Sequence, residues 1–162
     1  MITNQLNAKP VAEVTSAPDE SAVNPDPVNY VEVIETVISS LALEQSAMVR
    51  HTAEGYLWKF TYGSVEVFVQ LTGLTDEDTL TVWSPLMAMP ADNNAALMRK
   101  LLEMNWTETA EARFGIFNDQ IVALACRTLT ELEPGEIARA IAIVAFVADA
   151  NDNSLRAEFG NA

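Results

Sequence analysis

Few residues in this chain of 162 could do acid–base or nucleophilic chemistry. His51 is the only histidine, so a triad that pairs a nucleophile with an imidazole base would have to be built around it. An isolated histidine at the edge of a predicted strand is more often a plain polar side chain. Cys126, the only cysteine, is expected to be a small buried hydrophobe. We therefore predict no catalytic residues and a protein that is not an enzyme.

Two acidic clusters have residue types that bind cations. Asp149, Asn151 and Asn153 match the opening of a calcium-binding loop, but the glycine and the bidentate glutamate that such a loop needs are missing. The run from Asp76 to Asp78 is typical of a solvated turn. The sequence also has no glycine pattern of a phosphate-binding or dinucleotide-binding loop. We therefore expect neither a metal site nor a cofactor.

The elements that would position these side chains follow from the spacing of apolar residues. Ile34, Ile38 and Leu41 share one helical stripe, whereas residues 56–62 alternate with the period of a strand. Together the patterns predict helices over 30–43, 93–106 and 135–150, and strands over 48–52, 56–62, 65–71, 79–87, 113–118 and 120–129. Such alternation is typical of antiparallel sheets. The expected fold class is α+β, with an antiparallel sheet of five to six strands and three helices in the order α-β-β-β(-β)-α-β-β-α.

The chain is expected to form one domain, residues 29–162, behind a disordered acidic N-terminal tail, residues 1–28. The tail is rich in Pro, Ala, Asn, Ser and acids, and this composition cannot bury enough apolar surface to offset its ordering entropy. The first residues lack a basic segment followed by a long apolar run, so no secretory signal is expected. One cysteine and no apolar stretch of about 20 residues predict a cytoplasmic protein without a membrane span.

The charge of the chain excludes some partners. Nine basic and 23 acidic residues give a formal net charge of -14. Nucleic-acid binding depends on Lys and Arg that neutralise phosphates, so we expect no binding to DNA, RNA or an anionic membrane. The simpler interpretation is that the acidity maintains solubility. The alternative is that an acidic face attracts a basic partner segment.

Aromatic residues fall on the side of the predicted sheet that is not needed for the core. If the valines of residues 65–69 face the helices, Phe68 lies on the opposite face and Trp83 joins it. A second layer or dimer contact then covers these residues, or they stand alone on the surface, or they form an apolar patch for a partner. Met87 lies on the same alternation as Trp83 in a methionine-rich corner, and methionine adapts to irregular surfaces.

The last predicted helix is apolar almost all round between Ala140 and Ala148. One sheet covers one side only, so a second surface, most simply another copy of the chain, is expected against it. We therefore predict a homodimer, with Ile143, Val144 and Val147 among its contacts.

Three segments of the sequence resemble the bacterial YbjN-like domain: LWKFTYGSVEVFVQLTG, TLTVWSPLMAMPADNNAALMRKLLEMNW and RFGIFNDQIVALACRTL, the last followed by a helix that starts with proline. The resemblance covers residues 30–159 and rests on apolar patterns with punctuating residues such as Ser84, Pro85 and Asn93. It implies the fold of type III secretion chaperones and a homodimer without catalytic residues. Chaperones of this shape hold extended partner segments on their surfaces, whereas YbjN-like proteins are linked to the regulation of stress and motility.

Two functions of different class follow as hypotheses. The preferred one is a non-enzymatic, homodimeric, chaperone-like or regulatory adaptor that binds other proteins. The alternative is a small-molecule-binding or enzymatic α+β domain with a pocket between the sheet and the helix at 93–106. Convergent polar groups in a concave pocket would favour the alternative, and the sequence places almost none on the predicted inner faces.

Overall fold

The computed structural model of the chain describes residues 28–42, 48–52, 55–92 and 94–160, so the predicted tail lies outside the described residues apart from Val28. The elements in chain order are α1 (Tyr30–Leu41), β1 (Met48–Thr52), β2 (Gly55–Tyr62), β3 (Val65–Leu71), β4 (Thr79–Ala88), α2 (Asn94–Thr107), β5 (Arg113–Phe117), β6 (Gln120–Thr128) and α3 (Pro134–Phe159). The described strands form one antiparallel sheet of six in the order β1-β2-β3-β4-β6-β5. The predicted α+β class and element order are confirmed, and the weak strand β1 is present.

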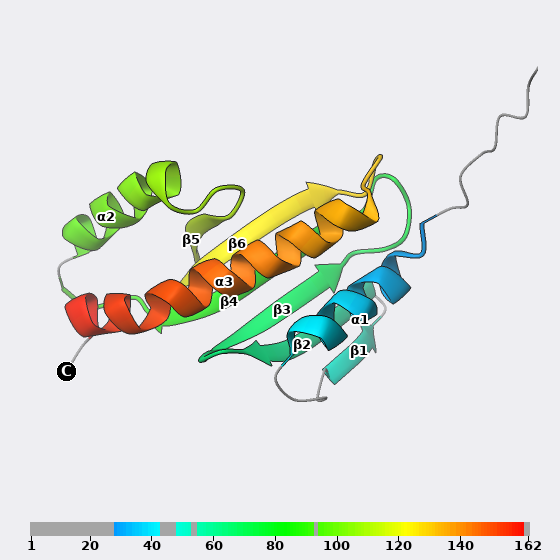
Figure 1. Cartoon of the computed structure of the whole chain (residues 1–162). Coiled ribbons are helices and arrows are strands. Elements are labelled where there is room, and N and C mark those ends of the chain that lie inside the picture. Colours follow the sequence, from blue (N-terminus) through cyan, green and yellow to red (C-terminus); the bar gives the residue numbers. More distant parts are fainter. Residues whose placement is uncertain (1–27, 43–47, 53–54, 93, 161–162) are drawn as a thin grey trace, which may run out of the picture.

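Helices α1 and α3 lie across the same face of the sheet, and no described helix lies across the other face (Figure 1). Each strand turns alternate side chains toward these helices, because successive residues of a strand point to opposite faces. Trp58 and Phe60 of β2, Val67 and Val69 of β3 and Val82 of β4 are at most 2% exposed. The hydrophobic core therefore lies between one face of the sheet and the helices.

α3 extends well past its predicted end at Ala150 and reaches Phe159. The Asn-Asp-Asn sequence after Ala150 has weak helix propensity, but Leu155 and Phe159 are buried and continue the apolar stripe. The side chain of Asn151 donates a hydrogen bond of 2.8 Å to the carbonyl of Val147 and so points back along the helix. Tertiary packing therefore overrides the weak helix propensity of this segment.

The turn between β2 and β3 is tied to α3 through Ser64. The backbone N–H of Ser64 donates to Asp149 Oδ1 at 2.7 Å, and its hydroxyl lies 3.0 Å from Asp149 Oδ1 and from Asp152 Oδ2. Gly63 has φ +53°, and a Cβ at this position would lie 2.0 Å from Asp149 Oδ1. Asp149, the first residue of the calcium-loop match, therefore belongs to a continuous helix and, together with Asp152, holds a turn in place.

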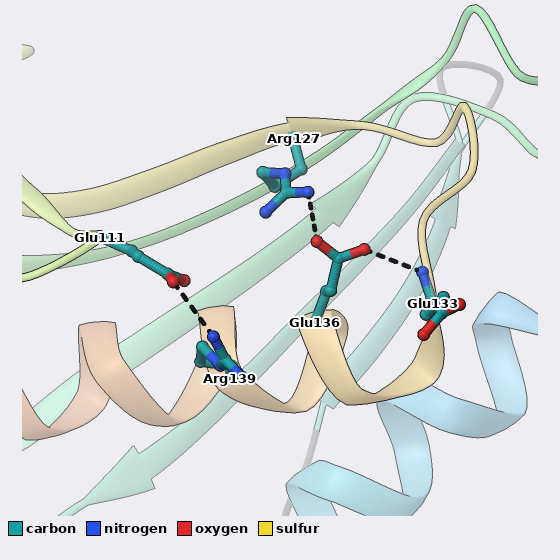
Figure 2. Close-up of polar contacts among 5 residues, drawn as sticks. All are labelled: Glu111, Arg127, Glu133, Glu136 and Arg139. Atoms are coloured by element: carbon teal, nitrogen blue, oxygen red, sulfur yellow. Dashed lines mark hydrogen bonds and ion pairs between the residues drawn. The ribbon is translucent and has the colours of Figure 1, made fainter.

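The start of α3 is fixed to its surroundings by charged side chains (Figure 2). Glu136 accepts a hydrogen bond of 3.2 Å from the backbone N–H of Glu133 and pairs with Arg127 of β6. These contacts, first the Glu133 N–H and then Arg127, lower the pKa of the Glu136 carboxyl. One turn later, Arg139 pairs with Glu111 at 3.2 Å. The helix start is thus joined both to β6 and to the segment before β5.

α2 packs beside β5 and closes part of its outer edge. Phe114 N donates to the side-chain oxygen of Asn105 at 2.6 Å, and the side-chain nitrogen of Asn105 donates to Phe114 O at 3.3 Å. Asn118 and Asp119 have φ values of 50° and 55°, as the two-residue hairpin between β5 and β6 requires. In such a hairpin Phe114 turns its backbone groups away from β6. The amide of Asn105 therefore occupies the place of a neighbouring strand.

Candidate protein-binding site

The face of the sheet turned away from α1 and α3, here called the open face, carries a row of paired side chains. The strand register places Lys59, Phe68, Trp83, Leu124 and Arg113 opposite one another on β2, β3, β4, β6 and β5. The rings of Phe68 and Trp83 stack, with centroids 5.2 Å apart and planes at 11°. The centre of the open face is therefore aromatic.

Phe117 at the end of β5 completes an aromatic patch, defined here as Phe68, Trp83, Leu124 and Phe117. Its ring lies edge-on to Trp83, with centroids 6.2 Å apart and planes at 70°. Phe117 is 52% exposed, and the other three side chains are half-buried. Beside Trp83 lies a hollow of about 230 Å³, which is lined by Gln70, Thr81, Trp83, Ile116, Phe117, Val122 and Leu124. The open face thus presents an apolar surface with one concave site.

The aromatic patch lies on a face with little net charge, although the chain as a whole carries -14. On the open side of β2 to β6 the charged residues are Lys59, Glu66 and Arg113. Lys59 pairs with Glu66 and lies 5.6 Å from the centre of the Phe68 ring. Arg113 donates to backbone carbonyls of the preceding segment. An acidic surface that attracts a basic segment is therefore not found here.

A second apolar surface lies on the outer side of α2 and is called here the α2 stripe: Met98, Leu102 and Trp106. Leu102 is 69% exposed and Trp106 is 91% exposed. The charged residues beside the stripe, Arg99 and Glu103, pair with each other at 2.9 Å. The stripe borders a shallow hollow together with these two residues. Since the charged groups are already paired, the surface is suited to an apolar contact.

The predicted contact residues on the sheet have different positions. Phe68 and Trp83 lie on the open face, where the alternation placed them, and their role in binding stays a prediction. Met87 was expected on the same face as Trp83 but is only 8% exposed. A β-bulge between Pro85 and Met87 shifts the register and turns Met87 to the core side, opposite the buried Ile121. Met87 is therefore not available to a partner of the folded chain.

The predicted contact through α3 also needs correction. Val144 is fully buried and Val147 is 4% exposed within a single chain, because α1 packs against α3 on the sheet face. Ile143 is half-buried and packs against the same core. The large side chain that α3 does expose is Phe146, at 64%. The apolar residues of α3 are thus covered by the sheet and by α1, and their burial requires no second chain.

The residues with reactive side chains are not assembled into a catalytic site in the described part of the chain. His51 lies in β1, whose side chains are outside the described residues. Cys126 is exposed and not buried as expected, because it lies opposite Thr81 on the open face. The described residues contain no group of three His, Cys, Asp or Glu that could hold a metal ion. Nor do they include a helix long and apolar enough to cross a membrane.

Asp78 closes the turn between β3 and β4. It accepts hydrogen bonds from the Thr75 hydroxyl at 2.7 Å, the Thr75 N–H at 2.9 Å and the Thr72 hydroxyl at 3.0 Å. These donors, in that order, lower the pKa of the Asp78 carboxyl. Asp78 therefore has a local structural role in an exposed turn.

A six-stranded antiparallel sheet with helices across one of its faces defines an α+β protein. A model of the YbjN family, described as "Putative bacterial sensory transduction regulator", matches residues 30–157. The chain belongs to the YbjN family. No curated protein sequence matches it.

Two solved structures are similar to this chain. A chain of the HopA1–SchA chaperone–effector complex has a TM-score of 0.50 and 12% identity, over 75% of this chain and 93% of that one. A chain of the ExsC–ExsE complex has a TM-score of 0.46 and 13% identity, over 75% of this chain and 90% of that one. The fold predicted from the resemblance, that of type III secretion chaperones, is confirmed.

Three exposed side chains of the two apolar surfaces were not identified from the sequence. Phe117 lies in a short strand, and only the hairpin register brings it beside Trp83. Leu102 and Trp106 lie in the helix predicted over 93–106, but no outward-facing apolar stripe was expected on it. A spacing of four residues from Met98 through Leu102 to Trp106 is the signal that could have shown a second helical stripe.

Proposed function

We propose that this chain is a non-enzymatic, homodimeric adaptor, chaperone-like or regulatory, that holds a segment of another protein on its open face. The observation that carries the proposal is the stacked pair of Phe68 and Trp83 on a sheet face that no described helix crosses. Exposed apolar patches of this kind are typical of protein interaction sites. Two comparisons support a protein as the partner. The family is described as a regulator, and a chain of a chaperone–effector complex shares the fold.

The alternative, a small-molecule or enzymatic pocket between the sheet and α2, has less support. The inner side of α2 is filled by Leu97, Leu101 and Met104, which are 0%, 5% and 7% exposed. The hollow at α2 lies on its outer side, where Arg99 and Glu103 already pair with each other. These residues therefore do not provide the convergent polar groups that a small-molecule or catalytic site needs. The exposed, free Cys126 suits a reducing cytoplasm, where we place the protein.

The homodimer is proposed to form through the α2 stripe and not through α3. Two copies of α2 packed antiparallel about a two-fold axis would place Leu102 against its own copy and Met98 against Trp106. The same arrangement brings Arg99 of one copy near Glu103 of the other, so that the charges flanking the stripe are complementary. Burial of a large apolar side chain contributes about 1.5 to 3 kcal/mol. The exposed Leu102 and Trp106 would therefore supply much of the association energy.

Partner binding is tested by capture from native lysate followed by mass spectrometry, with Phe68→Ser and Trp83→Ser as patch variants. Phe146→Ser is the matched control, because Phe146 is also an exposed aromatic residue but lies on α3. We expect at least one protein that is retained by the wild type and by the control and is lost from both patch variants. If no captured protein depends on the aromatic patch, the proposed function is wrong.

Dimer formation is tested by sedimentation at about 10 μM, a concentration at which a contact with a micromolar Kd is populated. We expect a dimer mass for the wild type and for Phe146→Asp, and a monomer mass for Leu102→Asp. Reversal of one charge, Arg99→Glu or Glu103→Arg, should weaken the dimer, and the double reversal should restore it. A monomer mass for the wild type would contradict the proposed homodimer.

A further inference from the structure

The hollow beside Trp83 has the size of a single side chain. Its volume of about 230 Å³ is below the range of about 300 to 1,000 Å³ that is usual for small-molecule sites. Two of its walls are Trp83 and Phe117, whose rings stand at 70° to each other. An incoming ring can therefore stack on one wall while its edge meets the other. The half-buried Leu124 and the buried Val122 complete an apolar lining.

Two polar side chains also line this hollow. Gln70 and Thr81 are cross-strand partners on β3 and β4, in the row next to Phe68 and Trp83. The hydroxyl of Thr81 lies 3.5 Å from Cys126 Sγ, whereas the amide of Gln70 forms no hydrogen bond with another described residue. A primary amide both donates and accepts, which matches a peptide group. The lining thus suits a polypeptide better than a hydrocarbon chain.

The charges around the hollow define the partner further. Lys59 and Glu66 form an ion pair at one side of the patch, and Arg113 donates hydrogen bonds to backbone carbonyls. No unpaired carboxylate on the described open face is available to hold a basic segment. The net charge of -14 repels an acidic one at longer range. The surface is therefore complementary to an uncharged segment.

From these features we infer that the hollow is the anchoring site for the partner and takes one aromatic or large aliphatic side chain of an extended, uncharged polypeptide segment. The inference rests on the proposed function, because it specifies what the open face recognises. Gln70 then bonds the backbone of the segment next to the anchor, and Phe68 supports Trp83 from the other side. Specificity comes from the anchor side chain and not from charge.

The test uses the full chain and four synthetic peptides of about 12 residues, built from Ser, Thr, Asn and Gln with a central Trp, Phe, Leu or Ala. Binding is followed by fluorine NMR of protein labelled with 5-fluorotryptophan, in which Trp83→Phe identifies the Trp83 signal. We expect the Trp and Phe peptides to shift this signal and to bind at least about tenfold more tightly than the Ala peptide. Raising NaCl from about 50 to about 500 mM should change the Kd less than about twofold.

Variants that fill the hollow provide the structural control. Leu124→Trp and Thr81→Tyr should each weaken binding of the Phe peptide at least about tenfold, since a large side chain then occupies the anchor position. Thr61→Trp places the same bulk on the open face of β2, away from the hollow, and should change binding less than about twofold. Circular dichroism shows whether each variant is folded, and the two filling variants act at separate positions.

Several results would overturn the inference. They are equal affinity for all four peptides, no binding of any of them, tighter binding of a basic peptide, or unchanged binding by both filling variants. A change in sedimentation mass caused by Leu124→Trp would show that a second copy occupies the hollow instead. If a captured protein depends on Trp83 but is unaffected by Leu124→Trp, the proposed function stands and only the anchoring site is wrong.

Discussion

The Glu136 carboxylate is a charged group whose contacts in the folded chain stabilise the fold. Its carboxylate accepts from the Glu133 N–H and pairs with Arg127, and these contacts lower its pKa. A carboxyl with a lowered pKa in the folded state stabilises the fold above the ordinary glutamate pKa. This contribution is lost as the pH falls through the lowered folded-state pKa.

Replacement of this carboxylate should have an effect that depends on pH. We expect Glu136→Gln to lower the free energy of unfolding slightly at neutral pH, and we expect the difference from the wild type to shrink as the pH falls to about 3. Urea unfolding at several pH values measures this difference. Glu77→Gln is the control, because the exposed Glu77 carboxylate forms no hydrogen bond or ion pair with another described residue. A difference that grows toward acid pH would contradict the prediction.

The residue-level predictions succeeded where strand alternation alone decides the outcome. Phe68 and Trp83 lie opposite the core side of their strands, as their spacing indicated. The prediction that Met87 lies on the same face as Trp83 was wrong, because a β-bulge adds one residue to β4. The bulge is visible only in the pairing of β4 with β6. The prediction that Cys126 is buried was wrong, because the alternation of residues along β6 does not indicate which of the two faces is covered. Alternation assigns faces within a strand, whereas packing decides which face is buried.

At the scale of elements, α3 shows the limit of a pattern that is apolar all round. The sequence indicated correctly that this helix needs cover on more than one side. It could not show that α1 provides the second cover, because the position of α1 against α3 depends on the whole topology. The same reasoning overlooked α2, whose outer stripe is more exposed than that of α3. A helix with less apolar surface is therefore the better candidate for contact between copies.

Two substitutions in α3 compare the effect of a charge on stability at a buried position and at an exposed position. Val144→Asp places a carboxylate at a fully buried position and should lower the free energy of unfolding by at least about 3 kcal/mol. Phe146→Asp, half a turn further on at an exposed position, should change it by less than about 1 kcal/mol. Urea unfolding followed by circular dichroism measures both. If Val144→Asp retained full stability and altered only the sedimentation mass, the original assignment of Val144 to a dimer contact would be restored.

At the scale of the whole molecule, the fold class and the element order followed from the sequence. The periods of the apolar residues indicated each element, and the short turns required neighbouring strands to pair as hairpins. The pairing of β4 with β6 was not predicted, because α2 and β5 separate these strands along the chain. This pairing brings Leu124 beside Trp83 and so creates the patch. The candidate site therefore depends on the pairing of β4 with β6, a non-local contact that the spacing of apolar residues does not predict.

The domain is expected to fold without the predicted N-terminal tail. Deletion of residues 1–28 should change the melting temperature by less than about 2 °C, since it leaves Asn29 to accept from the Glu32 N–H at the start of α1. Asn29→Ala in the full chain should instead destabilise the protein by about 1 kcal/mol through loss of this N-cap. Thermal unfolding followed by circular dichroism compares the two. A large loss of stability on deletion would mean that the tail contributes to the core.

The side chain of Asn105 at the outer edge of β5 has a consequence for how long the proposed partner segment would stay bound. Because this amide already bonds Phe114 N and Phe114 O, an incoming chain cannot extend the sheet there with a ladder of backbone hydrogen bonds. A segment held on the open face by its side chains can leave without breaking such a ladder. Residence times can range from milliseconds to days, and this geometry favours the short end. A protein that binds the proposed segment in this way would be suited to pass it on rather than to store it.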